Sequence, residues 1–162
     1  MDSDGLYMVG SSDEFQLKTS RIFQKHIPDI PLRFFEEGDH IVDLFSSRQT
    51  HQFPALIIVV VNKVGVDAIK ILKRLKNPDN TYPEYLKGIP VIILVGEENN
   101  PGITACYRAG ANAVLYKSDD VEKLTRTFQS ICDFWIDINR GPEFGRQGML
   151  QICSRTEDLL KD

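Results

Sequence analysis

The segment from Pro54 to Lys76 constrains the fold most, because it holds the longest apolar run in the chain and passes directly into a helical pattern. The six consecutive apolar residues from Leu56 to Val61 are mostly β-branched. An apolar run without alternation is typical of a strand that is covered on both faces in a parallel sheet. The segment therefore predicts a central strand of an α/β protein.

The residues after this strand follow a different period. Between Val66 and Lys76 the apolar residues lie three or four positions apart, with Asp67 near the start and basic residues near the end. These charges complement the helix dipole, so the spacing predicts a helix over 66–76. A strand, a short loop and a helix together form one half of a βαβ unit.

Length and composition indicate one globular domain. The 162 residues, 42% apolar and 26% charged, suffice for a sizeable core. A net charge of −4 at pH 7 gives no reason to expect nucleic-acid binding and disfavours an anionic membrane surface. The first residues lack the pattern of a signal peptide, and no apolar stretch has the length of a membrane span. We therefore expect a cytoplasmic protein with no nucleic-acid or membrane partner.

The cysteines do not form a metal-site or disulfide pattern. Cys106, Cys132 and Cys153 are far apart, with no CxxC pair and no histidine at ligand spacing. This arrangement predicts three reduced and largely buried thiols. We expect no cofactor and no structural metal.

Four further apolar segments of strand length alternate with helical patterns along the chain. The additional strands are predicted at 6–9, 30–35, 91–95 and 113–116, and the additional helices at 12–25, 40–48, 103–110 and 119–138. Five strands alternating with five helices indicate a flavodoxin-like, doubly wound (βα)5 domain with strand order 2-1-3-4-5. We expect this domain to span residues 1–139. The tail at 140–162 is weakly helical, and docking back, dimer contacts and fraying all remain open.

The loop before the first predicted helix has two interpretations. Ser11 stands three residues before Glu14, which is the spacing of a capping box. The same loop could instead cradle a phosphate between strand and helix. Asp13 and Glu14 bring negative charge into the first turn, so capping is the preferred interpretation.

The end of the central strand carries the main functional clue. Ligands and chemistry collect at the carboxyl ends of the strands in an open parallel sheet. Here that position is occupied by Val60, Val61 and Asn62. A metal site or a phosphorylatable carboxylate needs an oxygen there, and valine offers none. The clue is therefore a negative one.

The sequence resembles the response-regulator receiver domain over nearly the whole length to residue 139. In the central segment the likeness fixes the register without gaps. The residues that carry it there are Pro54, Leu56, Ile57, Asn62, Gly65, Asp67, Leu72, Lys73, Arg74, Leu75 and Lys76. The segments 89–95 and 108–117 resemble the family's fourth and fifth strands. The loop after residue 76 and the Phe-Trp pair in the last helix resemble single-domain regulators that partner bacterial phytochrome kinases.

The resemblance implies where the family's working residues would fall in this chain. The phosphoacceptor aspartate falls on Val60, and the acidic pair that holds magnesium falls on Gly10 and Ser11. The switch hydroxyl falls on Val95, and the aromatic switch falls on Val114. None of these residues can supply the family's chemistry.

Of the family's site, only the lysine remains, as Lys117. Asn62 matches a position at which the family uses mainly the backbone carbonyl. Ser118 replaces the usual proline after the lysine. The resemblance therefore implies a degenerate receiver, or pseudo-receiver, without phosphoacceptor, magnesium or enzymatic activity.

The first hypothesis is a module of two-component or phosphorelay signalling that acts without phosphorylation. It would dock a histidine kinase, another regulator or an output protein through its fourth helix, fifth strand and fifth helix, as a monomer or homodimer. In this hypothesis Lys117 pairs with Glu97 or Glu98 and mimics the phosphorylated state. A solvated lysine in a loop is the equally open alternative.

A second hypothesis is a small-ligand sensor that uses the emptied pocket, with polar contacts from Ser11, Ser12 and Lys117. No motif pairs a nucleophile with a base, so the sequence does not indicate an enzyme. A third hypothesis is an ordinary regulator that uses a phosphoacceptor elsewhere in the chain.

Overall fold

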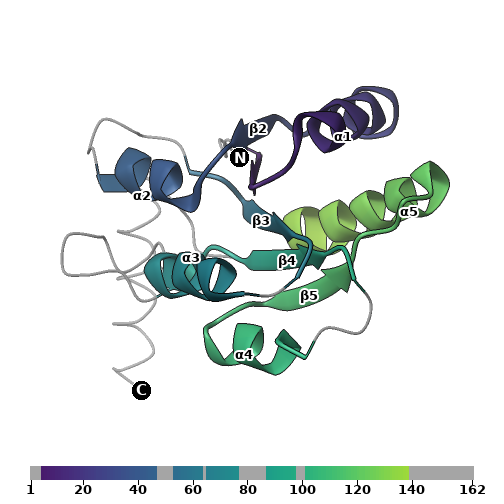
Figure 1. Ribbon diagram of the computed structural model, residues 1–162. Helices are drawn as coiled ribbons and strands as arrows, with labels where there is room; N and C mark the ends of the chain where they lie inside the picture. Colours follow the sequence, from purple (N-terminus) through teal and green to yellow (C-terminus); the bar gives the residue numbers. More distant parts are fainter. Residues whose placement is uncertain (1–4, 47–52, 64, 77–86, 98–100, 139–162) are drawn as a thin grey trace, which may run out of the picture.

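The computed structural model describes residues 5–46, 53–63, 65–76, 87–97 and 101–138. Within them a single parallel sheet runs in the order β2-β1-β3-β4-β5 (Figure 1). The strands are β1 (Leu6–Val9), β2 (Leu32–Phe35), β3 (Leu56–Val61), β4 (Val91–Val95) and β5 (Ala113–Tyr116). This is the predicted flavodoxin-like order, and the expected fold class is confirmed.

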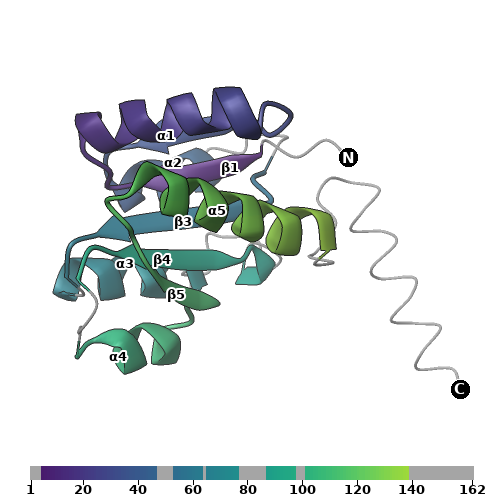
Figure 2. The same ribbon diagram turned by 90° about the vertical axis from the view of Figure 1, so that its right-hand side faces the viewer.

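Helices cover both faces of the sheet. They are α1 (Asp13–His26), α2 (Gly38–Ser46), α3 (Val66–Lys76), α4 (Ile103–Arg108) and α5 (Val121–Cys132), which η2 (Asp133–Ile138) continues with π-helical bonding. Helices α1 and α5 lie on one face, and α2, α3 and α4 lie on the other (Figures 1 and 2). The boundaries of β1, β3, β4, β5, α1 and α3 agree with the predicted segments to within one residue. Strand β2 begins two residues later, and α2 begins and ends two residues earlier. Helix α4 ends two residues earlier than predicted, and α5 begins two residues later.

Strand β3 is the centre of the core, as its unbroken apolar run predicts. Leu56, Ile58 and Val60 pack in the layer beneath α1 and α5. Ile57 and Val59 pack in the opposite layer, beneath α2, α3 and α4. All five side chains are buried, so the strand contributes to both layers at once.

The predicted capping box at α1 is wrong in its residue. Ser12, not Ser11, is the N-cap, because its Oγ accepts a hydrogen bond from the Phe15 N–H at 3.2 Å. Gly10 turns the chain with a φ of 81° directly after β1, which leaves Ser11 outside the helix. The helix then starts at Asp13, one residue later than the Ser11 spacing requires.

Two of the three cysteines are free and buried thiols, as predicted. Burial, with smaller contributions from Asp133 and Asp137, raises the pKa of Cys132 to about 12. Burial also raises the pKa of Cys106. Cys153 and the predicted tail at 140–162 lie outside the described residues. None of the described helices has the length and apolar character needed to cross a membrane.

Candidate functional site

The carboxyl edge of the sheet gathers most of the residues that the sequence singles out. Backbone hydrogen bonds hold this edge together after the strands end: the Gly96 N–H donates to Val61 O at 2.9 Å, and the Lys117 N–H donates to Val95 O at 2.7 Å. On the other side of β3, the Gly10 N–H donates to Phe35 O at 3.1 Å. These hydrogen bonds therefore fix the starting points of the loops after β1, β4 and β5 relative to the neighbouring strands, including the end of β3.

Val60 lies at the centre of this edge. Its side chain is 6% exposed and belongs to the apolar cluster that also contains Phe15 and Leu94. Its partner in the neighbouring strand is Leu94. The strand end is therefore dry and aliphatic at the position where the resemblance places the phosphoacceptor.

Gly10 lies so close to β3 that a side chain there would crowd the strand backbone. A Cβ atom at Gly10 would lie 3.0 Å from the carbonyl oxygen of Val60, and its φ of 81° belongs to the left-handed region that favours glycine. An acidic residue at this position would be strained in the present backbone. The next residue, Ser11, has a buried Oγ with no hydrogen-bond partner among the described residues.

The ammonium group of Lys117 contacts an aromatic ring. Its Nζ lies 4.7 Å from the centroid of the Phe15 ring, which is a cation–π contact. Glu97 instead forms an ion pair with Lys63 at 3.8 Å, and both of those side chains are exposed. The hypothesis that Lys117 pairs with Glu97 is therefore wrong in this structure, and Glu98 lies outside the described residues.

The two predicted switch positions are apolar and packed. Val95 is buried at the end of β4, and Val114 packs partly against the same layer. The backbone N–H of Val114 donates to the hydroxyl of Tyr107, on α4, at 3.1 Å. The sequence analysis missed Tyr107, since nothing in the residue pattern predicts that a tyrosine on α4 reaches the backbone of β5.

Asn62 is exposed directly after β3. A Cβ atom at Gly96 would lie 3.1 Å from Asn62 Oδ1, so the amide side chain lies over the start of the loop that follows β4. This neighbour relationship connects the loops after β3 and β4.

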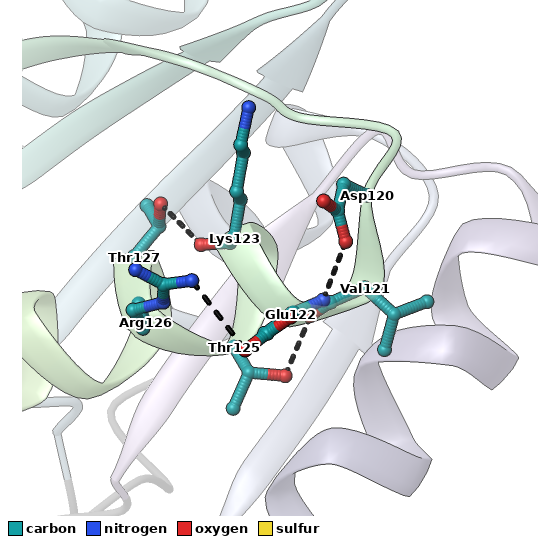
Figure 3. A network of polar contacts seen from close by, with 7 residues as sticks. All are labelled: Asp120, Val121, Glu122, Lys123, Thr125, Arg126 and Thr127. Atoms are coloured by element: carbon teal, nitrogen blue, oxygen red, sulfur yellow. Dashed lines mark hydrogen bonds and ion pairs between the residues drawn. The ribbon is translucent and has the colours of Figure 1, made fainter.

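Hydrogen bonds fix the loop that follows Lys117, and Figure 3 shows the one between Asp120 and Glu122. The Ser118 Oγ accepts from the Asp120 N–H at 3.1 Å, and the Asp120 Oδ1 accepts from the Glu122 N–H at 2.9 Å. Asp120 is thus the N-cap of α5. Further along the helix, Arg126 pairs with Glu122 at 3.5 Å. Ser118 thereby orders the loop at the position where the resemblance leads one to expect a proline.

The described residues do not offer a metal site. They contain no group of three or more His, Cys, Asp or Glu side chains that could hold a metal ion. A magnesium ion needs several converging oxygen ligands. Glycine and serine stand at the positions to which the resemblance assigns the acidic pair. The residues present therefore do not fit the magnesium ion that the receiver family uses.

No family model matches the sequence. Among solved structures, the chain is similar to the response regulator RPA3017 in red light signaling of R. palustris. Those chains are 23% identical, with a TM-score of 0.71 over 86% of this chain and 99% of that one. The phosphorylated cyanobacterial phytochrome response regulator RcpA is 20% identical, with a TM-score of 0.67 over 87% of this chain and 100% of that one. The Mn(2+)-bound form of response regulator Rcp1 is 24% identical, with a TM-score of 0.64 over 86% and 99%. The chain therefore has the receiver-domain fold.

One curated relative is the probable methanogenesis regulatory protein FilR2 of Methanothrix harundinacea, which is 27% identical over 89 residues. The match covers 55% of this chain and 54% of the relative. The chain thus spans about half the length of the curated relative that it matches.

Proposed function

We propose that this chain is a pseudo-receiver of two-component signalling, which binds a protein partner without being phosphorylated. Val60 is the observation that carries the proposal. It is an almost fully buried aliphatic residue at the end of β3, where the resemblance to receiver domains places the phosphoacceptor. An acyl phosphate requires a carboxylate, and valine has no atom that can accept the phosphoryl group.

The surroundings of Val60 support the same conclusion. Gly10 and Ser11 supply no carboxylate, and the close approach of Gly10 to the Val60 carbonyl leaves no unstrained position for one. Rcp1, a structural neighbour, is described with Mn²⁺ bound. Without converging oxygen ligands, this chain would bind a divalent ion negligibly.

The proposed docking surface is formed by α4, β5 and the start of α5. Three large apolar side chains on these elements are exposed: Tyr107 by 49%, Tyr116 by 42% and Val121 by 51%. Exposed tyrosines are enriched at protein interfaces because they combine apolar area with a hydrogen-bonding hydroxyl. A histidine kinase, another regulator or an output protein is the partner class that the receiver fold suggests. Without a phosphorylation switch, the surface would be held in one conformation.

A phosphorylation assay tests the proposal directly. The protein is incubated with acetyl phosphate and Mg²⁺, and separately with beryllium fluoride and Mg²⁺, beside a receiver domain that is known to be phosphorylated. We expect no added phosphoryl group by intact-mass spectrometry and no Mg²⁺-dependent change in Trp135 fluorescence. Addition of one phosphoryl group to any side chain would contradict the proposal and support an ordinary regulator.

A small-ligand sensor is the second candidate, and Ser11 is the observation that favours it. A buried hydroxyl without a partner calls for an explanation, and a bound polar ligand would supply one. Ser12 and Lys117 would add polar contacts. A thermal-shift screen with nucleotides and metabolites separates the two candidates, because a specific ligand raises the melting temperature.

A further inference from the structure

Strand β2 forms an outer edge of the sheet, and its pairing partner is β1. The carbonyl oxygens of Pro31 and Phe35 accept from N–H groups of β1 and of the residue that follows it. Odd-numbered residues of β2 therefore turn their backbone groups toward β1, and Leu32 and Phe34 turn theirs outward. Such an edge is a template for another strand.

Arg33 lies on this edge strand, and its guanidinium group packs over two aromatic rings. Its guanidinium carbon lies 4.9 Å from the centroid of the Phe35 ring and 5.9 Å from that of Tyr7. Stacking on aromatic rings restrains the guanidinium and leaves its N–H groups available for a carboxylate. No ion pair of Arg33 occurs within the part of the chain that the structure describes.

A hollow of about 640 Å³ lies beside Arg33, between β2 and α2. Phe35 and Leu44 give it an apolar lining, and Glu36 and Asp43 add two carboxylates. The hollow therefore adjoins the outward backbone groups of β2 and combines apolar area with charge of both signs. It has room for the side chains of an extended segment.

We propose that the edge of β2 takes up an extended segment of a partner protein as a sixth strand, with an acidic side chain opposite Arg33. Main-chain hydrogen bonds to Leu32 and Phe34 would supply affinity, and the Arg33 pair would supply specificity. Glu36 and Asp43 favour a basic side chain farther along the same segment. This site lies at the opposite edge of the sheet from β5, so it stands independently of the docking surface proposed above.

A second copy of this chain fits the edge less well. In the antiparallel register that bonds Leu32 of one copy to Phe34 of the other, the two Arg33 side chains lie directly opposite each other. Like charges in directly opposed positions destabilise a strand pair. Charge complementarity therefore favours an acidic partner segment over self-association.

Synthetic peptides test this site. The probe has nine residues, with alternating threonine and valine, a central glutamate and a lysine at each end; the comparison peptide has a central lysine instead. We expect the wild-type protein to bind the glutamate peptide about tenfold more tightly by fluorescence anisotropy. Amide exchange at Leu32 and Phe34, followed by NMR, should slow when the peptide is added.

Arg33→Glu should reverse the preference between the two peptides, whereas Arg21→Glu, an exposed charge reversal on α1, should leave it unchanged. Phe34→Pro removes one outward N–H and should weaken both peptides, with Trp135 fluorescence confirming that each variant is folded. Equal affinity for the two peptides, or binding that does not protect Leu32 and Phe34, would overturn the proposal. Protection of these amides without peptide, together with a dimer in analytical ultracentrifugation, would overturn it in favour of a second copy.

Discussion

The ammonium group of Lys117 lies 4.7 Å from the centre of the Phe15 ring and connects the loop after β5 to the first turn of α1. Lys117 is partly buried, and Phe15 is 7% exposed. The lysine that the resemblance assigns to the receiver site thus has a structural contact that needs no phosphoryl group. Its role can be measured as a stability effect.

We predict that Lys117→Met and Phe15→Leu are energetically coupled. A cation–π contact at a partly exposed site contributes about 0.5–1 kcal/mol, so the coupling free energy should fall in that range. Urea unfolding of both single variants and the double variant, followed by the single tryptophan, measures it. A coupling energy of zero would show that the lysine is merely solvated.

Val60→Asp should destabilise the protein without restoring phosphorylation. The carboxylate would enter an apolar cluster without a partner, at a cost of about 3 kcal/mol. Burial would raise its folded-state pKa above the unfolded value of about 4, so the folded state would bind more protons and the variant would lose stability as the pH rises above that value. Val60→Asn provides the control, since it should be destabilised without this pH dependence. Phosphorylation of the aspartate by acetyl phosphate would contradict the prediction.

Gly10→Ala should lower the free energy of unfolding by about 1–2 kcal/mol, because the left-handed conformation places an alanine Cβ too close to the carbonyl oxygen that follows it. The contact it would make is with the Val60 carbonyl. Gly65→Ala is the matched control, because a Cβ there meets no atom within 4 Å and Gly65 does not have a positive φ. Thermal and urea unfolding of the two variants should therefore differ clearly, and equal effects would show that the turn at Gly10 relaxes freely.

Thr19→Val should stabilise the protein. The Thr19 side chain is fully buried, and its hydroxyl has no partner among the described residues. Replacing an unsatisfied hydroxyl by a methyl group of similar volume removes a desolvation penalty of about 1 kcal/mol. In Thr125→Val the hydroxyl that is lost donates to the Val121 carbonyl at 2.7 Å, so we expect no such gain there. A decrease in the free energy of unfolding for Thr19→Val would indicate a buried water or another hidden partner.

Lys76 should make stability rise with pH in the alkaline range. Its Nζ donates to the carbonyl oxygens of Lys87 at 3.1 Å and Ile89 at 2.7 Å, and burial lowers its pKa from 10.5 to about 8. Between these two pKa values the unfolded chain binds more protons than the folded one, so raising the pH through this window favours folding. The free energy of unfolding of the wild type minus that of Lys76→Met should therefore increase from pH 8 to 10. A constant difference would mean that the ammonium keeps its ordinary pKa.

Hydrophobic periodicity predicted the fold because the element type depends mainly on local sequence. The unbroken apolar run in β3 predicts a strand that is buried on both faces, and the spacing of apolar residues in α3 predicts a helix with one buried face. The N-cap of α1 depends instead on the backbone turn at Gly10, which a serine and glutamate spacing does not reveal. The partner of Lys117 was also missed, because Phe15 lies about a hundred positions away and only the packing of α1 over the sheet brings the ring to the lysine.

The hydrogen bond from Val114 to Tyr107 makes the two borders of the sheet unequal. On the β5 border the Val114 N–H already donates to the Tyr107 hydroxyl of α4, so an incoming strand would first have to displace that hydroxyl. The β2 border carries no comparable obstacle within the described residues. If a foreign strand joins this sheet as proposed, the described residues therefore hinder it less at the β2 border than at the β5 border, where the Tyr107 hydroxyl already holds the Val114 amide.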